Sequence, residues 1–190
     1  MSTKHRSQTG TRLPDPNFVH PEVIAPETTA GKWLRYVNAA IRVSIGWVFL
    51  WAFIDKLWGF GFATPAAKAW INGGSPTTGF LKSAEGTFKG FYNGMAGQAW
   101  ADWLFMIGLA GIGLALILGV GMRIAAAAGS LLLVLMWAAE LPLANNPFMD
   151  DHLVYAMVLV ALALASAGRT FGLGGRWEQL GFVQKYSWLK

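Results

Sequence analysis

The sequence contains no cysteine among its 190 residues. This absence excludes disulfides, thiolate metal sites, iron–sulfur clusters and dithiol relays, and it leaves the redox compartment undecided. Charged residues are also scarce: they make up 13% of the chain, about half the usual share of a globular protein. Hydrophobic residues make up 54%, and the mean hydropathy is +0.41. The composition therefore predicts a membrane protein rather than a soluble one.

The first 31 residues lack the apolar stretch that a secretory signal peptide requires. They contain four prolines and many serine and threonine residues, a composition typical of segments that do not fold by themselves. We therefore expect residues 1–31 to form a flexible tail on the cytoplasmic side.

Four apolar stretches approach the length of about 20 residues that a helix needs to cross a bilayer. They are residues 33–58, 102–122, 124–143 and 152–168. We expect an all-α integral membrane protein, with a four-transmembrane-helix bundle in residues 32–169. An extended extracytoplasmic loop, residues 59–101, is expected between the first two spans. Residues 170–190 are expected to lie at the cytoplasmic interface.

The basic residues predict the orientation of these spans. Ten of them accompany the two termini and the hairpin at Arg123, whereas four lysines fall on the opposite side. Because lysine and arginine are enriched in cytoplasmic loops, both termini are expected to face the cytoplasm in a multi-pass protein of the cell (plasma) membrane. The net charge of +5 is spread along the chain, so no nucleic-acid partner is expected.

The loop at residues 59–101 carries aromatic residues with helical spacing. Phe88, Phe91 and Tyr92 fall at positions i, i+3 and i+4, which predicts a short amphipathic helix. Such a helix would either anchor the loop at the membrane surface or cover a site at the end of the bundle as a lid.

One basic residue lies within the first span. Arg42 is about five residues inside its apolar part, roughly 8 Å deep at the rise of an α-helix. It would either reach the cytoplasmic interface with its long side chain or be buried and paired with a carboxylate or a quinone carbonyl. Gly46, Phe49, Phe53 and Lys56 follow on the same helical face. This stripe is typical of helix packing and also compatible with a cofactor slot.

The turn between the last two spans is rich in acids. Glu140 ends the third span, where an isolated carboxylate would be unfavourable, so we expect it to pair with Lys56, to be protonated or to face a wet cavity. Asp150 and Asp151 precede the fourth span, where acids stabilise a helix N-terminus. His152 follows them directly. Glu140 and His152 are therefore the polar residues of this turn that turn formation alone does not explain.

His152 is the single histidine outside the N-terminal tail. A b-type haem would need a second axial ligand, and the spans contain no second histidine, so no haem is expected. Glu140, Asp151 and His152 have a spacing that matches no recognised metal-ligand pattern. No metal site is expected on this ground.

Two segments of the sequence that contain several of these residues together resemble a known protein family. The first span contains Arg42, Gly46 and Phe49, followed by Lys56-Leu57, and the last span reads "NNPFMDDHLVYAMVLVALALASAGRTFGLGGRWE". Over roughly residues 33–178 this pattern resembles the DoxX/DoxD-like membrane protein family. The resemblance is clearest to the branch labelled as the thiosulfate:quinone oxidoreductase DoxD-type subunit.

The resemblance implies a four-helix membrane protein in redox metabolism. Together with a partner subunit, such a protein would oxidise thiosulfate to tetrathionate and reduce a quinone. The candidate catalytic residues are Glu140, His152 and Asp151. The candidate substrate- or quinone-binding residues are Arg42, Lys56 and Asp55. The expected cofactor is a quinone as electron acceptor, and the expected partners are the lipid bilayer and a redox subunit or a second copy of the chain.

Two other functions fit the residues. One is a non-catalytic membrane subunit that anchors a partner redox or stress-response enzyme, with the acidic turn and the outer loop as its binding surface. A small transporter is the third hypothesis. Many secondary transporters are built from inverted repeats, however, and the four spans have no evident repeat of this kind. The outer edge carries six acids against four lysines, a balance that disfavours a dianionic substrate such as thiosulfate.

Overall fold

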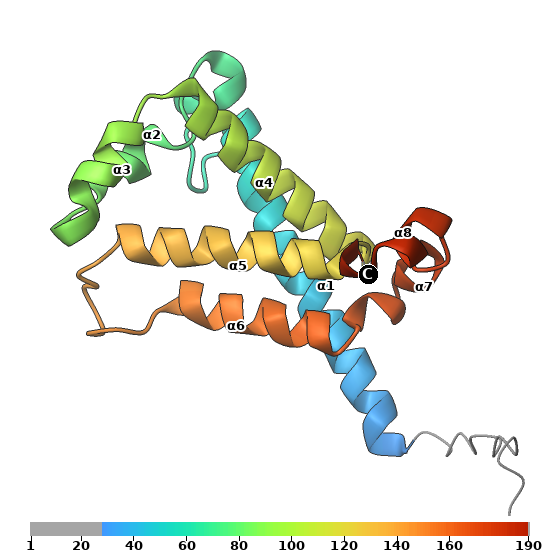
Figure 1. The fold of residues 1–190 in the computed structure, drawn as a ribbon. Coiled ribbons are helices and arrows are strands. Elements are labelled where there is room, and N and C mark those ends of the chain that lie inside the picture. Colours follow the sequence, from blue (N-terminus) through green and yellow to red (C-terminus); the bar gives the residue numbers. More distant parts are fainter. Residues whose placement is uncertain (1–27, 190) are drawn as a thin grey trace, which may run out of the picture.

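The structure, a computed structural model, describes residues 28–189, which form helices and turns without a β-strand (Figure 1). Most of the tail expected at residues 1–31 lies outside the described residues. Its last part is helical, because helix α1 (Thr29–Trp58) begins where the side chain of Thr28 accepts the backbone N–H of Gly31. A threonine at this position satisfies a donor that the first helical turn leaves unpaired.

Three helices are long and apolar enough to cross a membrane. They are α1, α4 (Ala99–Leu118) and α5 (Met122–Ala139). The fourth apolar helix, α6 (Asp151–Leu164), has 14 residues, a length of about 21 Å against a hydrocarbon core of about 30 Å. It is shorter than the expected span because Ser166 adopts a left-handed conformation with φ of 51° and turns the chain. These helices indicate a multi-pass membrane protein.

The long helices pack as two pairs. Helix α1 lies along α4, and α5 lies beside α6 in the opposite direction (Figure 1). Residues 119–121 join α4 to α5, with Gly119 and Gly121 both at positive φ, so the connection is tight. At the crossing of α1 and α4, a Cβ on Gly113 would lie 2.7 Å from the backbone nitrogen of Leu50. Glycine therefore permits the close approach of these two helices.

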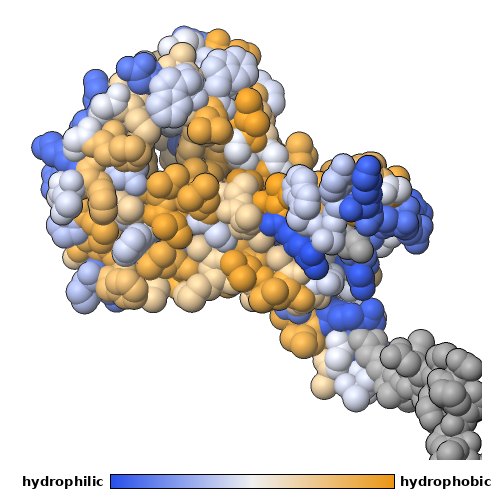
Figure 2. Space-filling view, in the orientation of Figure 1, coloured by the Kyte–Doolittle hydropathy of each residue, from blue (hydrophilic) through white to orange (hydrophobic). Residues whose placement is uncertain are grey.

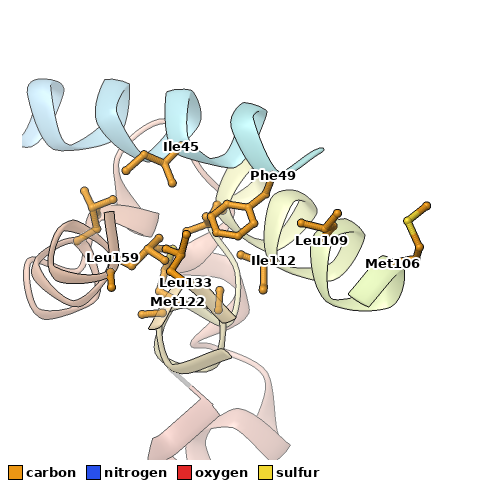
Figure 3. Packing of buried hydrophobic residues seen from close by; sticks show 14 residues of the cluster. Ile45, Phe49, Met106, Leu109, Ile112, Met122, Leu133 and Leu159 are labelled. Carbon is orange, nitrogen blue, oxygen red and sulfur yellow. The ribbon is translucent and has the colours of Figure 1, made fainter. Parts of the chain in front are cut away.

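The main hydrophobic core lies where the two pairs meet. Figure 3 shows Ile45 and Phe49 of α1 pointing towards Ile112, Leu133 and Leu159. These five residues come from α1, α4, α5 and α6, so each of the four apolar helices contributes to one core.

The outward faces of the helices are apolar as well. Large hydrophobic side chains such as Leu104, Ile107, Leu131 and Met157 are exposed. Figure 2 shows hydrophobic residues over much of the visible face, whereas hydrophilic residues gather near α7 (Gly174–Trp177) and α8 (Gly181–Lys185). Exposed apolar surface on this scale is typical of helices in contact with lipid rather than water.

The segment between α1 and α4 folds over one end of α5. Its short helices are α2 (Thr78–Ser83) and α3 (Lys89–Met95). The predicted aromatic helix corresponds to α3, in which Tyr92 is buried and Phe91 is exposed. The Tyr92 hydroxyl donates to the carbonyl oxygen of Leu135 in α5 at 2.8 Å. Burial raises the pKa of the Tyr92 phenol above its usual value.

Candidate functional site

The turn between α5 and α6 is held by its own hydrogen bonds. The side-chain oxygen of Asn146 accepts the backbone N–H groups of Phe148 and Met149, each at 2.9 Å. The indole N–H of Trp137 donates to the carbonyl oxygen of Phe148, also at 2.9 Å. These bonds bring Glu140, the C-cap of α5, close to Asp150, the N-cap of α6.

Three carboxylates surround the imidazole of His152. Its Nδ1 lies 2.8 Å from Oδ2 of Asp150, 3.6 Å from Oδ1 of Asp151 and 3.8 Å from Oε2 of Glu140. The side chains of His152 and Asp150 are 15% and 14% exposed, whereas those of Glu140 and Asp151 are 41% and 71% exposed. We call these four residues the acid–histidine cluster. It has a nearly buried centre and a solvent-exposed rim.

This arrangement has defined chemical uses. A histidine whose Nδ1 is held by a carboxylate has a fixed orientation and tautomer, so its Nε2 is the nitrogen left for a ligand. Among residues 28–189, no hydrogen bond involves Nε2 of His152. The cluster can therefore exchange protons with a bound molecule or contribute ligands to a cation.

An apolar groove of about 550 Å³ begins beside the cluster and follows α5 and α6. Met149 and Leu153, which lie on either side of Asp150 and His152 in the sequence, line one end, and Leu164 lines the other. Val134 of α5 and Val160 of α6 line it between these ends. The groove itself is apolar: none of the four cluster residues lines it, although Met149 and Leu153 are their neighbours in the sequence.

Arg42 lies outside this cluster and is completely buried. Its guanidinium donates to the backbone carbonyls of Leu116 and Ile117 at the end of α4, and to those of Thr170 and Phe171 after α6. The C-terminal carbonyls of a helix attract a cation. Among residues 28–189, Arg42 therefore pairs with backbone carbonyls rather than with a carboxylate, and it ties three segments of the chain together.

Asp55 and Lys56 make their contacts at the other end of α1. The buried Asp55 carboxylate accepts the N–H groups of Ala63 at 2.9 Å and Thr64 at 2.8 Å. The Lys56 Nζ lies over the ring of Phe105 in α4, 5.9 Å from its centroid. Within residues 28–189, no ion pair joins Lys56 to Glu140.

The structure thus brings together Glu140, Asp151 and His152 from the sequence-predicted site, and leaves Arg42, Asp55 and Lys56 elsewhere. It adds Asp150, which sequence reasoning treated as a helix cap only. The position of Asp150 in the sequence could have indicated that it belongs to the site. A carboxylate that caps a helix points at the first-turn residues, and here the second of them is a histidine.

The fold and the cluster define a helical protein with three helices of membrane-spanning length and a polar site at one helix end. No family model, curated protein or solved structure matches the chain. The resemblance to the DoxX/DoxD-like family therefore stays a prediction from the residues.

Proposed function

We propose that the protein is the membrane subunit of a quinone-linked redox system. The quinone ring would lie at the acid–histidine cluster, and its isoprenoid tail would lie in the groove along α5 and α6. The observation that carries the proposal is the apolar groove lined at one end by Met149 and Leu153, the sequence neighbours of the hydrogen-bonded Asp150 and His152. Membrane quinones combine a long apolar tail with a polar head that accepts protons on reduction.

Quinone reduction requires two electrons and two protons, one for each ring oxygen. With Nδ1–H donating to Asp150, a doubly protonated His152 would donate a hydrogen bond from Nε2–H to a quinone oxygen and then transfer that proton, which leaves the neutral imidazole. Glu140 would supply the other proton. Asp151, as the most exposed member of the cluster, would exchange protons with the solvent.

The electrons would come from a partner rather than from a carrier in this chain. The sequence has no cysteine to hold an iron–sulfur cluster. Thiosulfate is the first donor to test, because of the DoxX/DoxD resemblance. Two thiosulfate ions would join through a new S–S bond and release two electrons. Thiosulfate is a dianion, and the cluster holds three carboxylates, so its oxidation is assigned to a partner subunit.

The test uses the purified full chain in detergent with a short-tailed quinone. Quinone binding is measured for the unmodified protein, for His152→Gln and for a control, Glu85→Gln, an exposed acid in the segment before α3. We expect His152→Gln to weaken binding by about 10-fold, since it removes one hydrogen bond to a polar head, and the control to bind normally. If the unmodified protein binds no quinone, the proposal fails and the anchor function takes its place.

A further inference from the structure

We infer that Glu140, Asp150 and His152 form a binding site for a divalent transition-metal ion. Each of these residues offers one ligand atom, and the three atoms lie within 4.8 Å of one another. Two of them come from the start of α6 and the third from the end of α5. The site goes beyond the proposed quinone function and does not depend on it.

The distances suit a single ion. Ligand atoms bound to an ion at about 2.0–2.2 Å lie roughly 3.0–3.5 Å apart in tetrahedral or octahedral geometry. Nδ1 of His152 lies 2.8 Å from Asp150 and 3.8 Å from Glu140. For all three to coordinate one ion, ligand atoms up to 4.8 Å apart would have to approach to about 3.5 Å. Nδ1 would also give up its hydrogen bond to Asp150, with the imidazole proton then on Nε2.

The charges also favour a cation. Asp151 places a third carboxylate 3.6 Å from the same imidazole nitrogen, so three acids converge on a group that can carry at most one positive charge. Like charges at such separations repel, and a divalent cation between them would remove the repulsion. One imidazole with several carboxylates is a ligand set that suits manganese, iron or zinc, whereas magnesium and calcium prefer oxygen ligands alone.

Asp150 and His152 are held in place before an ion binds. Oδ1 of Asp150 accepts the N–H of Leu153 at 3.2 Å and fixes the carboxylate at the helix start. His152 stands in the first turn of α6. Glu140 is the more exposed ligand, so it would close over an ion that enters from the solvent.

The sequence did not indicate this site because its ligands come from two helices. Glu140 ends α5, whereas Asp150 and His152 lie at the start of α6. Glu140 and Asp150 are separated by a nine-residue turn, residues 141–149. The packing of α5 against α6 and the hydrogen bonds made by Trp137 and Asn146 bring the helix ends together.

The test is a titration of the full chain, purified in detergent and treated with a chelator, with Mn²⁺ followed by electron paramagnetic resonance and with Zn²⁺ followed by calorimetry. We expect one ion per chain. Glu140→Gln, Asp150→Asn and His152→Gln should each weaken binding by about 10-fold or more. Asp150→Asn retains the helix cap, so a loss in this variant cannot be attributed to unfolding. Glu85→Gln, an exposed acid elsewhere, is the matched control and should bind normally.

Two outcomes would overturn the inference. One is binding that His152→Gln leaves unchanged and that Mg²⁺ matches in strength, as expected of diffuse attraction to acids. The other is the absence of any binding. The result is separable from the quinone proposal, because Val160→Trp, which fills the groove, should weaken quinone binding and leave Mn²⁺ binding unchanged.

Discussion

The carboxylate of Asp150 contacts the imidazole of His152 and also caps helix α6. Its Oδ2 lies 2.8 Å from Nδ1 of His152, while its Oδ1 accepts the N–H of Leu153 at 3.2 Å. The same side chain therefore starts helix α6 and orients the imidazole. Stability and site chemistry depend on different atoms of one residue, which makes them separable by substitution.

Asp150→Ala should lower the free energy of unfolding by about 1 kcal/mol, because the first turn of α6 loses its cap. Asp150→Asn should retain most of that stability, since asparagine is an equally good N-cap residue. Thermal unfolding of both variants in detergent measures the difference. Equal stability of the two variants would mean that the cap contributes nothing.

Arg42→Met should destabilise the protein by about 3 kcal/mol or more, because the backbone carbonyls that Arg42 contacts lose their buried donor. Lys32→Met is the matched control, since Lys32 lies on the exposed part of the same helix. We expect the control to unfold at the normal temperature. A stable Arg42→Met variant would contradict the structural role assigned to this side chain.

Gly113→Ala should weaken the packing of α1 against α4 and cost about 1–3 kcal/mol, because its Cβ would meet the backbone of Leu50. Gly111→Ala provides the control on the same helix, where a Cβ meets nothing within 4 Å. Unfolding in detergent compares the pair. If the two substitutions destabilise the protein equally, the result would contradict the close packing of α1 against α4 at Gly113.

Asp102→Ala should loosen the segment between α1 and α4. The buried Asp102 carboxylate accepts hydrogen bonds from the hydroxyls of Ser75 at 2.8 Å and Thr77 at 2.6 Å. Losing these bonds costs about 1–3 kcal/mol, so tryptic cleavage at Lys82 and Lys89 should accelerate about 10-fold. Glu85→Ala, at an exposed position between those lysines, should leave the cleavage rate unchanged; acceleration by both variants would contradict the role of Asp102.

The sequence predicted the three long helices with modest errors at their ends. The second and third spans were expected at residues 102–122 and 124–143, whereas α4 ends at Leu118 and α5 at Ala139. Hydropathy does not register that Gly119 adopts a left-handed conformation and caps α4. For the same reason it overestimated the fourth span, which ends before the left-handed Ser166.

The site was predicted in part. Glu140 and His152 stood out because charged or titratable groups at the ends of apolar helices need partners. Lys56, one of the alternatives considered for Glu140, does not lie beside them, because α1 packs along α4 and places that lysine over Phe105. The contacts of Arg42 could not be predicted either, since they require the ends of α4 and α6 to meet at one point of α1.

The most direct test of the quinone proposal fills the groove without touching the cluster. Val160 lines the groove and Val154 lies elsewhere on α6; they are 47% and 42% exposed. The affinity for a long-tailed quinone, measured in detergent, should fall about 10-fold or more in Val160→Trp, because lost apolar contact weakens binding at about 25 cal/mol per Å². Val154→Trp should bind like the unmodified protein. Equal affinity in the two variants would contradict the placement of a quinone along α5 and α6.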